Sequence, residues 1–346
     1  MIFRNTFLFF FLTLTCINSY SQIGGGTTYD FLKLPSSARA SALGGTLFSA
    51  KDKDFNSALN NPALLTDTMS NNVSLNYMNF FSDINYGYVA YTKNIKKNQN
   101  IAFGIQYLDY GKFNSTDEYG NINGTFGASD MSFNISYARP VKDSNLTCGA
   151  TLKTIYSNFN SNTSWGSAID ASCVYVIPKY NFGITAMVQN AGIQWKTYTS
   201  GGTRENLPFQ MLLGCSKKLQ HAPIRLSLTY QNMERWNMVY DTITTSNIKN
   251  YKIKNFGDNL MRHLIIGGEL IISKNFFVSA GYNYQRREEL KIENRKGMTG
   301  FSFGFGLRIY KFQLSYGRAS YSIAGASNTF SIIFDLNNFY QKKQAN

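Results

Sequence analysis

The sequence has few of the residues from which catalytic, metal and disulfide sites are built. Its 346 residues include 2 histidines, 4 cysteines and 6 prolines. Three of the cysteines, Cys148, Cys173 and Cys215, follow the N-terminal leader and stand far apart. Their odd number and wide spacing predict neither a disulfide framework nor a metal site. Outside the leader, no apolar run approaches the roughly 18 residues of a membrane-spanning helix.

The first residues have the pattern of an export signal. Arg4 precedes an apolar run over 7–17, and small and polar residues follow. This order predicts a secretory signal peptide over residues 1–21, cleaved before Gln22. Cys16 leaves open a second interpretation, a lipoprotein acylated at that cysteine. In either case the rest of the chain is predicted to leave the cytoplasm.

Aromatic residues are abundant, with 27 Phe and 23 Tyr. In many places apolar residues occupy every second position, as in Met131–Tyr137, where Ser132, Asn134 and Ser136 alternate with them. A period of two predicts a β-strand whose side chains point to opposite faces. In a soluble sandwich the apolar face would be the core. Here the other face is rich in Gly, Ser, Thr and Asn, which is typical of the lumen of a barrel in lipid.

Fourteen such segments follow one another along the chain. They are 72–82, 84–95, 100–108, 130–139, 145–156, 166–177, 180–190, 208–218, 223–232, 261–273, 275–285, 299–309, 311–319 and 327–336. Most have about the 9–11 residues that a tilted strand needs to cross a bilayer, and their number is even. The pattern predicts an all-β fold, a 14-stranded antiparallel transmembrane β-barrel over residues 72–336.

The connections between these segments alternate in length. The predicted outward connections include long ones at 109–129, 157–165, 191–207, 233–260, 286–298 and 320–326, whereas the returning turns have only a few residues. Long extracellular loops and short periplasmic turns are typical of bacterial barrels. A sandwich gives no reason for this sorting. The alternation of loop lengths therefore supports the barrel, and it predicts that the long loops face outward and the short turns face the periplasm.

Positive charge gathers at the predicted short turns. The chain has a formal net charge of +14. The basic residues at this end, with Asp143 as the single acid, are Lys93, Lys96, Lys97, Arg139, Lys142, Lys179, Lys217, Lys218, Lys274 and Lys311. A basic periplasmic tail is predicted over 337–346. The lysines either bind anionic lipid or an acidic partner, or simply end strands and extend to the interface. Their spread around a rim argues against nucleic acid as a partner.

Residues 22–71 do not alternate and contain glycine clusters and runs of small residues. A short helix is predicted around 54–59, capped by Asp52 or Asp54 and ended by Asn60-Asn61-Pro62. A barrel of 14 strands is wide enough to leak unless its lumen is filled. We therefore predict that residues 22–71 fold back as a hatch that plugs the lumen.

Several stretches resemble known barrels. Ala42-Leu43-Gly44-Gly45, Asp52, Ser57-Ala58 and Asn61-Pro62-Ala63-Leu64 resemble the N-terminal hatch of FadL-like outer-membrane barrels. On this resemblance the candidate hatch residues are Gly44, Gly45, Asp52, Ser57, Asn61, Pro62 and Ala63. Five longer stretches resemble the PorV/PorQ family of the type IX secretion system, and they are 22–45, 76–93, 106–113, 152–157 and 207–227.

The resemblance implies a location and a role. It implies a barrel in the outer membrane of a Gram-negative bacterium that anchors a PorZ-like surface protein in an attachment complex. A PorU-like sortase and a PorV-like barrel are the further partners, with outer-membrane lipid around them. The protease chemistry of that complex belongs to the sortase, so no catalytic residue and no cofactor are implied. The alternative is a FadL-like transporter of hydrophobic small molecules, with Gly267-Gly268 as the candidate point of lateral opening.

A serine-hydrolase pattern is present but poorly placed. Gly300-Phe301-Ser302-Phe303-Gly304 matches G-x-S-x-G, a motif that needs a sharp strand-to-helix turn. Here it lies within an alternating strand, and the chain's two histidines, His221 and His263, fall elsewhere. We therefore predict that the protein is not an enzyme.

Two further sets of polar residues were considered for binding. Asp52-x-Asp54-x-Asn56 begins like a calcium loop but has Ser57 and Ala63 where that loop needs Gly and Glu, so a capping or hatch role is favoured. The candidate lumen-lining residues, on the polar faces of their strands, are Asp170, His263 and Glu269. They either line a permeation path or form hydrogen bonds with backbone groups of the hatch.

Overall fold

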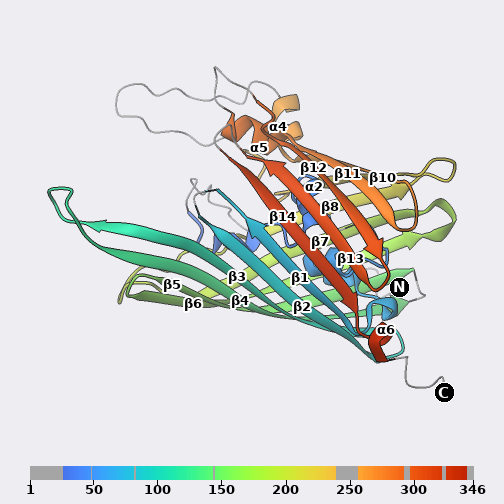
Figure 1. Cartoon of the computed structure of the whole chain (residues 1–346), viewed down its shortest axis with the longest axis horizontal. Helices are drawn as coiled ribbons and strands as arrows, with labels where there is room; N and C mark the ends of the chain where they lie inside the picture. The colour runs from blue at the N-terminus through green and yellow to red at the C-terminus, as the bar shows by residue number, and fades with distance from the viewer. Residues whose placement is uncertain are drawn as a thin grey trace, which may run out of the picture.

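Fourteen strands form a closed antiparallel barrel in the computed structural model (Figure 1). Each strand pairs with the next along the chain, and β1 closes the ring on β14. The structure describes residues 26–47, 49–81, 83–142, 145–238, 256–291, 297–321 and 325–340. The predicted signal peptide, Cys16, residues 22–25 and residues 341–346 of the predicted tail lie outside this part of the chain. The barrel confirms the predicted fold class.

The strands follow the predicted segments one for one. They are β1 (Asn72–Asn79), β2 (Asn85–Lys96), β3 (Gln99–Thr116), β4 (Ile122–Lys142), β5 (Leu146–Phe159), β6 (Asn162–Ile177), β7 (Phe182–Lys196), β8 (Gln210–Lys218), β9 (Ile224–Tyr230), β10 (Leu264–Ile271), β11 (Phe276–Asn283), β12 (Phe301–Ile309), β13 (Phe312–Ser320) and β14 (Ala326–Asp335). The alternation of apolar and polar residues predicts these strands, because successive side chains of a strand in a barrel wall face the lumen and the outside in turn.

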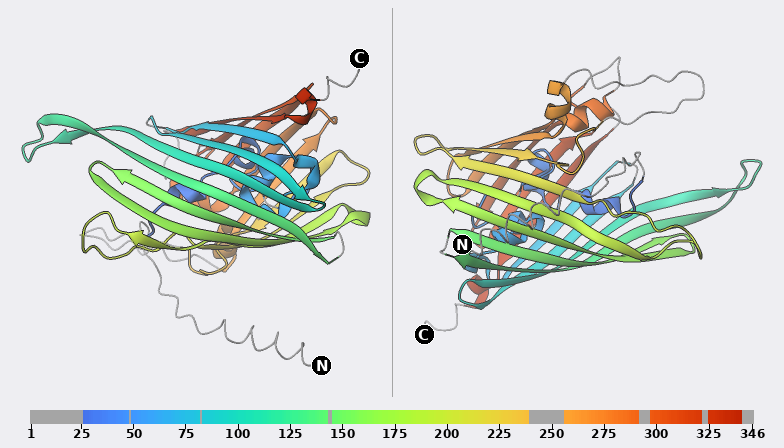
Figure 2. Two further views of the ribbon diagram at one scale, coloured as in Figure 1. Left: turned by 90° about the horizontal axis from the view of Figure 1, so that it is seen from below. Right: turned by 180° about the vertical axis from the view of Figure 1, so that it is seen from behind.

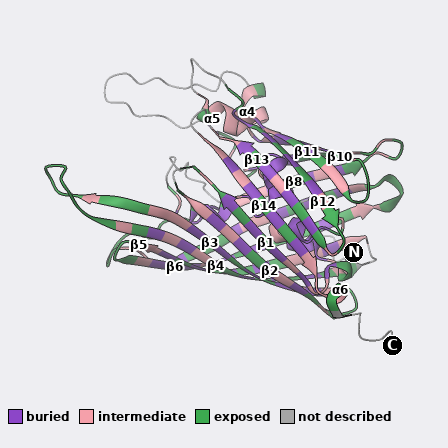
Figure 3. Cartoon of the chain, in the orientation of Figure 1, coloured by how far each residue is buried: buried purple, intermediate pink, exposed green. Residues whose placement is uncertain are grey.

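The outside of the wall is the apolar face. In β3, Phe103, Ile105 and Tyr107 are each more than two-fifths exposed, whereas Ala102 and Gln106, which alternate with them, are buried. The same alternation appears as buried and exposed stretches along the strands in Figure 3. A continuous belt of exposed Phe, Tyr, Ile and Leu around a closed barrel is the surface of a transmembrane barrel. None of the helices in the described part of the chain is long and apolar enough to span a membrane.

Two predicted outer loops are instead continuations of strands. β3 runs to Thr116 and β4 begins at Ile122, so that only 117–121 connect them, and β5 and β6 similarly replace most of 157–165. Phe113 stacks on Phe126 with ring centroids 5.4 Å apart. Cross-strand aromatic pairs stabilise a ladder, which explains why pairing continues beyond the apolar belt. Elsewhere at this end the chain forms α4 (Phe256–Arg262) and α5 (Tyr284–Leu290).

The described part of the predicted hatch lies within the ring of strands (Figure 2). Its elements are η2 (Asp30–Lys33), α2 (Ala38–Ala42), α3 (Phe55–Asn60), η3 (Pro62–Leu64) and η4 (Asp67–Met69). The helix predicted around 54–59 is confirmed as α3, and Asp54 caps it by accepting the Asn56 N–H at 3.0 Å. The sequence analysis did not identify α2. At the other end of the chain, α6 (Asn337–Tyr340) follows β14.

The prediction about cysteines was wrong in one respect. Cys148 on β5 and Cys173 on β6 form a disulfide. They are directly opposite each other in the register of adjacent strands, with Cα atoms 4.1 Å apart. A separation of 25 residues along the chain did not reveal this because the register was unknown. Cys215 is a free thiol.

Candidate functional site

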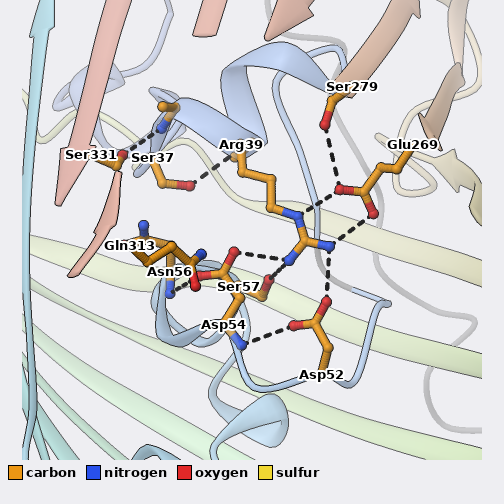
Figure 4. A network of polar contacts seen from close by, with 12 residues as sticks. Ser37, Arg39, Asp52, Asp54, Asn56, Ser57, Glu269, Ser279, Gln313 and Ser331 are labelled. Atoms are coloured by element: carbon orange, nitrogen blue, oxygen red, sulfur yellow. Dashed lines mark hydrogen bonds and ion pairs between the residues drawn. The ribbon is translucent and has the colours of Figure 1, made fainter. Parts of the chain in front are cut away.

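The hatch is joined to the wall by a buried charged cluster centred on Arg39. This residue lies on α2, which Ser37 caps by accepting the Ala40 N–H at 3.3 Å. Its guanidinium makes a two-pronged contact with Glu269 of β10, Nε to Oε1 at 2.7 Å and Nη2 to Oε2 at 2.8 Å (Figure 4). Such paired hydrogen bonds fix both distance and orientation. Arg39 therefore fastens α2 to the barrel wall.

Two carboxylates from the hatch complete the shell around Arg39. Asp54 Oδ2 lies 2.9 Å from Nη1, and Asp52 Oδ2 lies 2.9 Å from Nη2. From the wall, Arg225 of β9 contacts both Asp52, at 2.7 Å, and Glu269, at 3.0 Å. We name these five residues the clamp. Two cations thus face three carboxylates, and each of the three is in contact with a guanidinium.

The clamp changes the acidity of the hatch carboxyl groups. Burial alone would raise the pKa of Asp52, but Arg39 and Arg225 together hold it well below its usual range. Burial raises the pKa of Asp54, and Arg39 offsets this only in part. The oxygens of Asp52 and Asp54 are therefore engaged with guanidinium and backbone N–H groups. This arrangement supports the capping and hatch role over the calcium loop considered for this stretch.

The wall meets the hatch with glycines. A Cβ at Gly281 of β11 would lie 2.3 Å from Gly44 N, and one at Gly317 of β13 would lie 2.1 Å from Ala38 O. Since real side chains do not approach backbone so closely, only glycine permits this contact. Gly44 and Gly45 themselves have φ of 95° and 115°, which other residues rarely adopt. The wall glycines are thus required by the close approach of the hatch backbone, and Gly44 and Gly45 by their own backbone conformation.

A second junction lies at the Asn61-Pro62-Ala63 segment. The Asn61 side chain accepts the Ala63 N–H at 3.0 Å and so caps η3, with Pro62 at its first position. Ser172 of β6 donates to the same Asn61 oxygen at 2.6 Å. A Cβ at Gly149 of β5 would be 2.7 Å from Ala63 N. Ser57, the remaining candidate hatch residue, lies on α3 with its hydroxyl 3.3 Å from Arg39 Nη1.

The three candidate lumen residues do not come together. Glu269 belongs to the clamp, whereas Asp170 on β6 pairs with Lys153 of β5 at 2.8 Å. His263 lies just before β10, and its ring nitrogens are 2.9 Å from Gln231 O and 3.1 Å from Trp236 O. All three are buried and have partners within the protein. They form three separate structural contacts.

Ser302, the serine of the G-x-S-x-G pattern, lies within β12 and faces the hatch. Its hydroxyl is 3.0 Å from Ala42 O and 3.3 Å from Gly281 O. It is therefore a contact between wall and hatch, and it lacks the sharp turn that exposes a nucleophilic serine.

The basic members of these contacts, Arg39, Arg225 and Lys153, were not predicted from the sequence. Arg39 did give a signal, because it is a lone charge within the small-residue run Ser36–Ala42. A single arginine among residues that pack closely indicates a buried ion pair. The partner in β10 could not be found in this way, since it is 230 residues further along the chain.

One small cavity lies beside the hatch. A cavity lined in part by Leu32, Asn60, Met187 and Leu212 has a volume of about 30 Å³. This is room for a water molecule or two and not for a drug-sized ligand.

The chain matches no family model and no curated protein. Its fold is similar to solved outer-membrane channels. A TodX mutant, described as a monoaromatic hydrocarbon channel, is 12% identical with a TM-score of 0.49, over 86% of this chain and 97% of that one. A Pseudomonas aeruginosa FadL homologue is 12% identical with a TM-score of 0.46, over 87% and 98%. An outer membrane channel from Pseudomonas putida F1 is 9% identical with a TM-score of 0.35, over 76% and 94%.

Proposed function

We propose that this protein is a closed scaffold in the outer membrane of a Gram-negative bacterium. In this proposal it is a PorQ-like barrel of the type IX secretion system and holds a PorZ-like surface protein. A PorU-like sortase and a PorV-like barrel are the further members of the complex. The sequence resemblance supports the family, and the clamp is the observation that most supports a closed scaffold.

The clamp makes opening of the lumen costly. Removing one partner of a buried ion pair typically costs 3–5 kcal/mol, because the other charge stays buried and unpaired. Moving the hatch out of the lumen would separate Arg39 from Glu269 and Asp52 from Arg225 at once. The cavity that Leu32, Asn60, Met187 and Leu212 help to line beside the hatch has a volume of only about 30 Å³. A plug held in place by buried ion pairs fits an anchor better than a pathway.

The β3–β4 hairpin offers a surface for the partner. Its outer part projects beyond the neighbouring strands (Figure 1). Tyr119 at the tip is 89% exposed and Ile122 is 65% exposed. Pairing with β2 ends at Asp109, so among the described strands none pairs with 110–116 of β3 on that side. Free edges and exposed aromatic residues are both used by proteins to bind other chains.

The competing interpretation is a FadL-like transporter of hydrophobic small molecules, and it shares the fold. It requires a lateral opening, for which Gly267-Gly268 was the candidate. Both residues pair without interruption, Gly267 with Ser227 and Gly281, and Gly268 with Leu226 and Ala280. The register through this point has no bulge, which favours the scaffold.

Deletion of the gene and complementation test the proposal. We expect that cells without the barrel release the PorZ-like protein into the medium and lose cargo attachment, and that the full-length chain restores both. A barrel in which 113–125 is replaced by an Asn-Gly turn should fold but retain at least tenfold less partner. Antibody labelling of intact cells measures the partner, and an unheated gel shows whether the barrel is folded.

A matched variant shortens another outer connection, 199–203, and should retain the partner. Retention of the PorZ-like protein by cells without the barrel would overturn the anchoring proposal. Retention by the hairpin variant alone would overturn the assignment of the contact to β3–β4. Uptake of a long-chain fatty acid into liposomes containing the purified barrel would support the transporter instead.

A further inference from the structure

The outer face of the barrel carries an apolar groove along β11, β12 and β13. Its volume is about 510 Å³. Residues that line it include Val278, Phe303, Phe305, Leu307, Tyr316 and Arg318. Phe303, Phe305 and Val278 point outward and are each about two-fifths exposed. The groove therefore belongs to the apolar belt, where only lipid or another membrane protein can cover it.

An arginine stands at the outer end of this groove. Arg318 is exposed on the apolar face of β13, two residues before that strand ends at Ser320. Its Nη1 donates to Asn328 Oδ1 at 3.0 Å. A lipid-facing arginine costs about 2–4 kcal/mol at the membrane midplane but about 0–1 kcal/mol near the interface. The position of Arg318 therefore places its charge at the level of the outer headgroups.

A second arginine lies at the same end. Arg287 of α5 has its Cζ 6.0 Å from the ring centroid of Phe301, which stacks on Phe303 at 6.5 Å. Phe303 is directly opposite Arg318 in the register of β12 and β13. The two arginines thus flank one pair of aromatic rings. Within the described residues neither of them makes an ion pair.

We propose that this groove binds a phosphorylated lipid of the outer leaflet. An acyl chain would lie along the groove between the rings of β12 and β13. The phosphate would lie at Arg318 and Arg287, since guanidinium groups are well suited to bind phosphate. The proposal rests on the membrane placement given under the proposed function, but on no secretion partner.

The purified barrel in detergent provides the test. Bis-phosphorylated lipid A is added at increasing concentration, and retained lipid is counted by native mass spectrometry. We expect one lipid to be retained by the wild type and at least tenfold weaker retention by Arg318→Gln. Arg287→Gln should give a smaller loss in the same direction. Lipid A without phosphates should bind the wild type no better than it binds Arg318→Gln.

Arg308→Gln is the matched control, because Arg308 lies at the opposite end of β12 and bonds to Gln313 at 2.8 Å. It should retain lipid like the wild type. Phe305→Ser tests the acyl-chain part of the groove and should weaken retention with both arginines present. Equal retention by wild type and Arg318→Gln would overturn the proposal, as would equal retention of the two forms of lipid A. Neither result depends on whether the barrel serves secretion.

Discussion

The clamp has two buried carboxylates, Asp54 and Glu269, and the half-buried Asp52, and Arg39 contacts all three. The side chain of Arg39 is 5% exposed, so water screens these contacts little. The same guanidinium lies 5.4 Å from the ring of Phe277 on β11. One residue of the hatch therefore reaches two wall strands directly and a third, β9, through Asp52.

Arg39→Met should loosen the hatch without unfolding the barrel. Arg225 would still contact Asp52 and Glu269, whereas Asp54 would lose its guanidinium partner, and the expected loss of hatch stability is about 3–5 kcal/mol. Trypsin cleavage at Lys51 or Lys53 measures exposure of the hatch and should become faster. The matched change, Arg308→Met at the rim of β12, should leave cleavage unchanged. Cleavage of Arg39→Met at the wild-type rate would show that the clamp is not what holds the hatch.

Gly281→Ala tests the close approach of hatch and wall. Its new methyl group would lie 2.3 Å from Gly44 N and Leu43 C, both backbone atoms that cannot move away alone. Overpacking of this kind costs about 1–3 kcal/mol. Gly268→Ala is the control, because the nearest atom there is 3.9 Å away on the flexible Leu226 side chain. Thermal melts in detergent should separate the two variants, and equal midpoints would contradict this view of the interface.

At the scale of elements, the disulfide joins two strands that are already paired. Cys148 and Cys173 lie near the short-turn ends of β5 and β6 and on the outer face of the wall. The link therefore reinforces the periplasmic part of one hairpin. An exported chain meets the oxidising conditions in which such a bond persists.

Alkylation of the denatured mature chain measures this bond. Without reductant only Cys215 should react, and after reduction three thiols should react. Cys148→Ser combined with Cys173→Ser should lower stability by up to about 3 kcal/mol, the value expected for a loop of this order of length. In a Cys215→Ser chain, no label should appear before reduction. Three reactive thiols before reduction would show that the strands are not linked.

At the scale of the whole molecule, the barrel distributes apolar and polar side chains in the reverse of a soluble protein. Its exposed face carries the large apolar residues, and its buried face carries Ser, Thr, Asn and Gly together with the hatch. The hatch meets the wall through polar and glycine residues of the lumen face and also through buried apolar ones such as Ile155 and Val174. Lipid on one side and the hatch on the other are therefore both needed to cover the strands.

This arrangement predicts how the purified protein behaves. Without detergent the mature chain should aggregate, because the apolar belt has no other cover. In detergent, unheated samples should migrate on a gel as a compact form that boiling converts to the unfolded one. Refolded chain lacking 26–71 serves as the comparison and should convert at a lower temperature. A mature chain that stays monomeric in plain buffer would contradict the transmembrane barrel.

The sequence by itself determined the number of strands, their faces and the site of α3, because these depend on neighbours along the chain. The alternation at Met131–Tyr137 and the cap at Asp54 are both local signals. Strand pairing beyond the membrane, as between Phe113 and Phe126, could not be predicted from that alternation alone.

Only the tertiary structure decided which distant residues meet. Arg39 reaches Glu269 and Cys148 reaches Cys173 because the closed ring fixes register and brings the hatch against the wall. A one-residue shift in either strand would turn Glu269 or Cys173 to the opposite face. The wall positions Gly281 and Gly317 likewise require glycine only because the hatch backbone approaches them closely. Such contacts are set by closure of the barrel, which no local stretch of sequence encodes.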